Sequence, residues 1–187
     1  IDTDIFNANK IEQNQLVSFL KKFNIDTKKK IILFPGRLTN WKGQTDFLKI
    51  VSEFKDQPII FYFVGDDKNK SYLKKLLYEI NSKNLNENCR VLGHLQDNDL
   101  KMLYYFSSLV ISAPLKPEGF GRIVSETLSM KKIILSYNFG GAQNQLQGLD
   151  SLYKVEPHNY AELINKINTV LNLDIDTINK MGEVARE

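Results

Sequence analysis

Two carboxylates lie eight residues apart in the segment Glu118-Gly-Phe-Gly-Arg-Ile-Val-Ser-Glu126. The glycines predict a turn that opens a helix, and a helix N-terminus offers free N–H groups and a positive dipole end to a phosphate. From Phe120 to Glu126 such a helix rises about 9 Å, at roughly 1.5 Å per residue. A carboxylate accepts two hydrogen bonds, so the second glutamate suits a vicinal diol such as ribose. The segment therefore indicates a site for a nucleoside diphosphate attached to another group.

Two cations form a second candidate group. Arg37 and Lys42 lie five residues apart, and Lys42-Gly43 is predicted to open another helix. Two cations beside a helix N-terminus would neutralise a diphosphate, in particular a leaving diphosphate that gains charge. Two exposed loop cations would explain the same spacing, and this alternative stays open.

The other candidates also have ordinary structural explanations. Glu118 suits a position where a helix dipole favours an acid. Glu126 suits an ion pair with Arg122, four residues earlier, which is worth about 0.3–0.5 kcal/mol on a helix surface. His94, at the end of a predicted strand, could contact a phosphate or a hydroxyl, or be a loop histidine. Each explanation is plausible singly, and less so jointly if these residues share one edge of a sheet.

The elements that position these residues alternate along the chain. Short apolar runs rich in β-branched and aromatic residues predict strands of a sheet covered on both faces; they are 31–34, 59–64, 90–92, 109–113, 132–135 and 152–155. Helical periodicity marks 47–54, 72–80, 100–104, 123–128 and 160–171. Repeated β-α units predict an α/β fold, a Rossmann-like doubly wound parallel sheet of about six strands with helices on both faces. Ligands of such sheets bind at the carboxyl ends of the strands, where Arg37, Lys42, His94 and Glu118 fall.

Composition excludes several classes of protein. The chain has 187 residues, enough for one well-buried domain, with 42% hydrophobic and 25% charged residues. A net charge of +3 is too mild to indicate a nucleic-acid partner, and no apolar run approaches the roughly 18 residues of a membrane span. Cys89 is the one cysteine, which fits a reducing cytoplasm and excludes a disulfide framework. The chain lacks GxxxxGK[ST], and it lacks GxGxxG after the first strand, which disfavours P-loop ATPases and dinucleotide dehydrogenases.

Five short motifs follow one another along nearly the whole chain. They are Phe34 to Gly43 (FPGRLTNWKG), Phe63 to Asp66 (FVGD), Val91 to His94 followed by Asp99-Leu and Tyr104, Glu118 to Glu126 (E-x7-E), and Phe139-Gly-Gly141. This ordered set resembles the retaining glycosyltransferases of family 4 (glycosyl transferases group 1), which have the two-domain GT-B fold. One departure is Ala142-Gln-Asn-Gln145, where the family often has Pro-Glu, so the donor contacts of that loop are in question.

The resemblance implies roles for particular residues. Arg37 and Lys42 would hold the diphosphate of the donor and stabilise the departing nucleotide. Glu118 would contact hydroxyls of the transferred sugar, and Glu126 would bind the ribose. The catalytic residues implied are Glu118, Arg37 and Lys42. The donor-binding residues implied are Gly36, Arg37, Lys42, Leu92, Gly93, His94, Glu118, Gly119, Phe120, Gly121 and Glu126, with 92–94 beside the base. No metal or other cofactor is implied, because the cations and the helix dipole supply positive charge.

The resemblance also implies partners and a domain organisation. The donor would be a UDP-, GDP- or ADP-linked sugar, and a preceding domain would bind the acceptor, a glycan, lipid or protein. Residues 1–10 would be the interdomain linker and residues 11–187 the C-terminal nucleotide-sugar-binding domain, one half of a GT-B architecture. Both ends of the chain suggest a piece of a longer protein, so it is expected to bind nucleotide weakly and to transfer no sugar alone. A cytoplasmic location is expected, with peripheral membrane association of the full-length enzyme open.

Other functions compete with this interpretation. A nucleotide-sugar epimerase would need an acid–base set that the sequence does not offer, and a phosphorylase of the same architecture would need a pyridoxal-phosphate lysine. A non-catalytic nucleotide- or sugar-binding module would keep the site without the chemistry. A receiver-type docking domain would need acids at the end of the first strand, where this chain has Gly36-Arg37.

Overall fold

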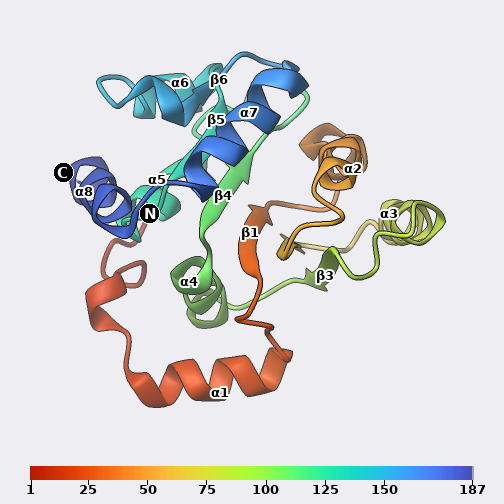
Figure 1. Ribbon diagram of the computed structural model, residues 1–187, viewed down its shortest axis with the longest axis horizontal. Helices are drawn as coiled ribbons and strands as arrows, with labels where there is room; N and C mark the ends of the chain where they lie inside the picture. The colour runs from red at the N-terminus through yellow and green to blue at the C-terminus, as the bar shows by residue number, and fades with distance from the viewer. Residues whose placement is uncertain (187) are drawn as a thin grey trace.

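Six strands form one parallel sheet in the computed structural model, which describes residues 1–186 (Figure 1). They are β1 (Lys30–Pro35), β2 (Ile59–Val64), β3 (Cys89–Gly93), β4 (Leu109–Ser112), β5 (Ile134–Tyr137) and β6 (Lys154–Val155). The order is β3-β2-β1-β4-β5-β6, so the direction of winding reverses between β1 and β4. A crevice forms at the carboxyl ends of the strands at such a reversal. The predicted Rossmann-like α/β class is confirmed.

Helices cover both faces of this sheet. They are α1 (Gln13–Phe23), α2 (Gln44–Glu53), α3 (Lys70–Ser82), α4 (Asp97–Phe106), α5 (Arg122–Ser129), α6 (Gly140–Gln145), α7 (Tyr160–Leu171) and α8 (Ile175–Arg186), with short 3₁₀ turns η1 (Ala8–Lys10), η2 (Asn40–Lys42) and η3 (Ser151–Tyr153). Helices α2, α3 and α7 lie on one side of the sheet, and α1, α4, α5 and α8 lie on the other (Figure 1). No helix within residues 1–186 is long and apolar enough to cross a membrane.

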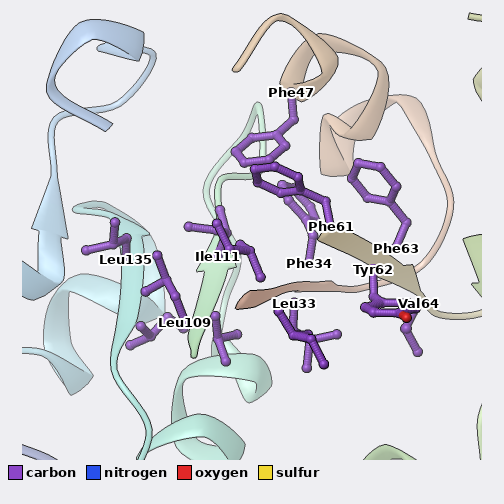
Figure 2. Packing of buried hydrophobic residues seen from close by; sticks show 14 of the residues in the cluster. Leu33, Phe34, Phe47, Phe61, Tyr62, Phe63, Val64, Leu109, Ile111 and Leu135 are labelled. Carbon is purple, nitrogen blue, oxygen red and sulfur yellow. The ribbon is translucent and has the colours of Figure 1, made fainter. Parts of the chain in front are cut away.

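The core explains why the strands are continuous apolar runs. All six residues of β2 are buried, because helices pack on both of its faces. Figure 2 shows Phe47 of α2 lying over the sheet, with its ring centroid 4.9 Å from that of Phe34 and 5.8 Å from that of Phe61. Leu33, Tyr62 and Val64 point to the opposite side (Figure 2). Side chains on both faces of the strands thus pack into the core and hold the sheet that carries the candidate loops.

Two strands differ from their predicted positions. The fifth, expected at 132–135, is β5 at Ile134–Tyr137, because Lys131 adopts a left-handed conformation (φ 56°) and the Lys132 N–H still bonds to a carbonyl of α5. The sixth, expected at 152–155, is reduced to Lys154–Val155. The Asp150 carboxylate accepts a hydrogen bond from the Leu152 N–H at 2.7 Å and so caps the 3₁₀ turn η3 in its place.

Helices α1 and α6 form at 13–23 and 140–145, where the sequence pattern predicted no helix. Helix α1 packs on α4, with the rings of Phe19 and Phe106 stacked 6.1 Å apart. The segment 1–10, expected to be a linker, contributes Phe6 to the core, where the side chain is 1% exposed.

Candidate functional site

A cleft of about 300 Å³ opens at the carboxyl ends of the strands, beside the reversal between β1 and β4. It is lined by the loop after β1 (Pro35, Gly36, Arg37, Lys42), the end of β2 (Val64, Gly65, Asp66), the segment before and in α4 (His94, Leu95, Asp97, Leu100) and the β4–α5 region (Glu118, Arg122, Ile123, Glu126). Six of the predicted site residues therefore share one cleft: Gly36, Arg37, Lys42, His94, Glu118 and Glu126.

Close backbone packing builds the floor of the cleft. A Cβ atom on Gly65 would lie 2.1 Å from the carbonyl oxygen of Gly36, so the ends of β1 and β2 approach as only glycine permits. Beyond this contact the chain turns through η2, and Gly43 (φ 80°) begins α2. This turn carries Lys42 back into the cleft.

Lys42 pairs with Glu118 across the cleft. The Lys42 ammonium donates a hydrogen bond to Glu118 Oε1, and the pair joins the loop after β1 to the loop after β4. Lys42 is 6% exposed, and its Nζ lies 5.0 Å from the centroid of the Trp41 ring. Arg37 is exposed, with its guanidinium 5.7 Å from the same ring. The explanation as two exposed loop cations is therefore wrong for Lys42 and stays open for Arg37.

Glu126 is a buried carboxylate held by two donors. Only 4% of the residue is exposed, and burial raises the pKa of its carboxyl. The Tyr104 hydroxyl donates to Oε2 at 2.9 Å, and the Arg122 Nε donates to Oε1 at 2.5 Å; both bonds favour the ionised form and offset part of that rise in pKa. The Arg122 guanidinium also lies 3.9 Å from Asp97 Oδ1. The pair of Arg122 with Glu126 forms as the spacing suggested, but its acid is buried and faces the cleft.

The paired glycines support the loop between β4 and α5. The Gly141 N–H donates to the Glu118 carbonyl at 2.8 Å, and a Cβ atom on Gly141 would lie 2.4 Å from the Phe120 carbonyl oxygen. The Gln145 amide donates hydrogen bonds to the carbonyls of Phe120 and Gly121. Gln145, the last residue of the segment where the sequence departs from the family pattern, thus helps to hold the loop that carries Glu118.

Other predicted residues lie beside the cleft and do not line it. Leu92 and Gly93 end β3, and Gly119, Phe120 and Gly121 form the turn before α5. The Phe120 residue is 61% exposed. Their proposed contacts with base, sugar and phosphate stay predictions.

Two residues of the site were not predicted from the sequence in the roles that the structure gives them. Asp97 was not named, and Tyr104 was noted only as part of a motif, without its bond to Glu126. Tyr104 and Glu126 are 22 residues apart on different helices, so helical spacing could not reveal the contact.

Neither the cysteine nor a cluster of metal-binding side chains adds chemistry to the described residues. Cys89 is buried, and burial raises the pKa of its thiol to about 12, so it packs as an inert side chain. Across residues 1–186, the histidine, cysteine, aspartate and glutamate side chains form no group of three or more suited to a metal ion. The expectation that no metal or other cofactor is needed stays a prediction.

Known proteins place this chain in a family. The family model for glycosyl transferases group 1 matches residues 18–187. The chain belongs to this family. It is similar to a lipopolysaccharide 1,2-N-acetylglucosaminetransferase of Salmonella typhimurium, with 24% identity over 175 residues, which are 89% of this chain and 45% of that protein.

Two solved structures have the same fold. A glycosyltransferase from Rickettsia africae superposes on the whole chain with a TM-score of 0.91 and 28% identity, over 49% of its own length. HepE from Anabaena, solved in complex with UDP-glucose, gives a TM-score of 0.83 at 22% identity, again over the whole chain and 50% of its own. This glycosyltransferase group 1 domain thus spans about half the length of each of these three proteins.

Proposed function

We propose that this chain is the donor-binding half of a retaining glycosyltransferase that takes a hexose from a nucleoside diphosphate sugar. The observation that carries this proposal is the Lys42–Glu118 ion pair, which joins two loops at the reversal of the sheet. A cation for a diphosphate and a carboxylate for sugar hydroxyls thereby face one cleft, with Glu126 in the same cleft for a ribose. The likeness to HepE, whose structure holds UDP-glucose, supports the class of donor.

The first role is to stabilise the leaving nucleotide. When the bond between the sugar and the diphosphate breaks, negative charge grows on the phosphate oxygen. Lys42 and Arg37 would bind the diphosphate, Lys42 exchanging its carboxylate partner for a phosphate oxygen. The N-terminus of α5, at Arg122, adds a positive dipole end at the same side of the cleft. This charge supply is why we propose a reaction without a metal ion.

The second role is to position the sugar. Once Lys42 turns to the diphosphate, the Glu118 carboxylate is free to accept hydrogen bonds from sugar hydroxyls and so orient the reacting carbon. Retention of configuration requires the acceptor to approach from the side that the nucleotide leaves. We assign the acceptor, a glycan, lipid or protein, to a separate domain. The half-cleft of this chain would then bind nucleotide weakly and transfer no sugar.

Calorimetric titration with UDP, GDP and ADP tests the donor site. We expect one nucleotide to bind best. Lys42→Ala and Glu126→Ala should each weaken its affinity about tenfold or more, because each removes a charge-assisted hydrogen bond. Lys22→Ala is the matched control. Lys22 also forms an ion pair, with Asp99 at 2.8 Å, but it lies between α1 and α4, and its loss should leave binding unchanged.

Two results would contradict the proposal. The first is a folded wild-type chain that binds none of the three nucleotides at millimolar concentration. The second is equal weakening by the Lys22 and Lys42 substitutions, since that would indicate general charge attraction and no defined site. Retention versus inversion is then read from the anomeric configuration of the product of the full-length enzyme.

A further inference from the structure

Each carboxylate oxygen of Glu126 accepts one hydrogen bond from a protein side chain. Tyr104 of α4 donates to Oε2 and Arg122 of α5 donates to Oε1. An ionised carboxylate has about four lone-pair sites on its two oxygens. One site on each oxygen therefore remains, and Glu126 is one of the residues that line the cleft. A vicinal diol presents two hydroxyl donors at a spacing that suits two oxygens of one carboxylate.

Tyr104 is fixed in place by packing. The residue is fully buried, and its ring meets the ring of Phe6 edge-on, with centroids 5.9 Å apart and an interplanar angle of 83°. A buried hydroxyl without a partner costs about 1–3 kcal/mol. Its bond to Glu126 is thus held by the surrounding core, and it fixes the rotation of the carboxylate.

Arg122 acts differently because it reaches the carboxylate from solvent. Its side chain is 63% exposed, and it bridges Glu126 and Asp97. Its charge compensates a carboxylate that burial would otherwise favour in the neutral form. The charged and titratable groups facing Glu126 are Arg122 from its own helix, Tyr104 and Asp97 from α4, and, around the same cleft, Arg37, Lys42, Asp66, His94 and Glu118.

We propose that Tyr104 and Arg122 are positioning residues that hold Glu126 as an oriented anion, with its remaining lone pairs directed at the ribose diol of the nucleotide. The inference rests on the proposed function, because it needs a nucleotide in the cleft. It goes further in assigning ribose recognition to a three-residue unit from two helices.

The test compares a ribonucleotide with its 2′-deoxy analogue. With the diphosphate that binds best, the wild type should prefer the ribose form by about tenfold or more, the worth of one hydrogen bond to a charged group. Tyr104→Phe should bring this ratio close to one, and Arg122→Gln should lower it at neutral pH. Both variants should leave the affinity for the deoxynucleotide nearly unchanged. Lys42→Ala should weaken both ligands equally, because it acts on the diphosphate.

Matched controls come from two residues that do not line the cleft. Tyr153→Phe removes another buried hydroxyl, one that donates to the Met181 carbonyl at 3.1 Å. Arg90→Gln removes a guanidinium that donates to the Asn24 carbonyl at 2.7 Å. Both variants should keep the wild-type ratio, so a general loss of stability is separated from loss of ribose recognition.

The pH dependence of the ribose-to-deoxyribose affinity ratio separates the effect of the orientation of the Glu126 carboxylate from that of its charge. Titration of the diphosphate itself cancels in the ratio. As the pH is lowered, the ratio should begin to fall at a higher pH in Arg122→Gln than in the wild type, because the Glu126 carboxylate takes up a proton more readily without the guanidinium. Arg122→Lys should restore most of the wild-type profile. Tyr104→Phe should lower the ratio even at high pH, where Glu126 is ionised.

The outcomes distinguish the two proposals. A wild type that binds no nucleotide overturns the proposed function and, with it, the ribose contact. If the wild type discriminates and Glu126→Gln abolishes discrimination, while Tyr104→Phe and Arg122→Gln keep it, the donor site stands and the positioning role is wrong. If all these variants keep the ratio, Glu126 does not contact the ribose.

Discussion

At the scale of single residues, Glu126 is where stability and binding conflict. Its carboxyl is buried, and burial raises its pKa above the ordinary value of 4.5. The fold therefore disfavours the charged form that would accept hydrogen bonds from a diol. A neutral side chain of the same size would suit this position better, which favours a ligand-binding explanation for the acid.

Glu126→Gln should therefore raise the stability of the chain at neutral pH. A group whose pKa is higher in the folded state than in the unfolded state binds a proton more tightly when folded. Its contribution to stability is present below the unfolded value and is lost as pH rises through the folded value. The gain from Gln should be largest at pH 7 and vanish near pH 4. Urea unfolding at both pH values measures it.

The exposed acid Glu53 provides the comparison. Glu53→Gln should change the free energy of unfolding by no more than about 0.5 kcal/mol at either pH. A Glu126→Gln variant that is clearly less stable than wild type at pH 7 would mean that the ion pair with Arg122 outweighs the cost of burial.

At the scale of elements, the loop before α5 depends on the turn that opens α6. Gly141 allows two backbones to meet at a distance that no side chain permits, and Gln145 of the same helix bonds to the loop carbonyls. The candidate site is thus formed by α5 and α6 together. Helix α6 contributes no side chain to the cleft lining, yet it determines where Glu118 lies.

Gly141→Ala should impair nucleotide binding as well as stability. The new methyl would lie 2.4 Å from the Phe120 carbonyl oxygen, so the loop must shift, at a cost of about 1–3 kcal/mol. Gly148→Ala is the matched control. Gly148 has open space but a φ of 85°, so alanine there costs a similar amount, about 1–2 kcal/mol, through backbone strain. Calorimetry should show weaker nucleotide binding for Gly141→Ala alone. Equal affinities in the two variants would mean that α6 does not determine the geometry of the site.

The same elements show how far the sequence could predict this site. Apolar runs and helical spacing located β1, β2, β4 and α5, because burial on two faces or on one stripe leaves a regular pattern. Because all the strands are parallel, Arg37, Lys42 and Glu118 then lie together at the carboxyl ends of the strands. Contacts such as Gln145 with Phe120, or Tyr104 with Glu126, leave no such pattern, because they join elements more than 20 residues apart through single side chains.

At the scale of the whole molecule, a line of contacts runs from the first residues of the chain to the cleft. Phe6 packs against Tyr104, and Tyr104 donates to Glu126. The segment 1–10 therefore takes part in the core that holds the proposed ribose carboxylate. A change in this segment is expected to be felt at the site, because packed cores transmit displacements.

Phe6→Ala should lower the free energy of unfolding by about 3–5 kcal/mol, as for other buried aromatic residues, and it should also reduce ribose discrimination by freeing Tyr104. Phe6→Leu, which keeps most of the apolar volume, should retain more of both. Ile1→Ala is the control, because Ile1 is exposed and its loss should change stability by no more than about 0.5 kcal/mol. Urea unfolding and the ribose-to-deoxyribose affinity ratio are measured on the same proteins. If Phe6→Ala matched Ile1→Ala in both measurements, the segment 1–10 would be a linker independent of the domain. If it lost stability but kept the ratio, Tyr104 would be held by α4 alone.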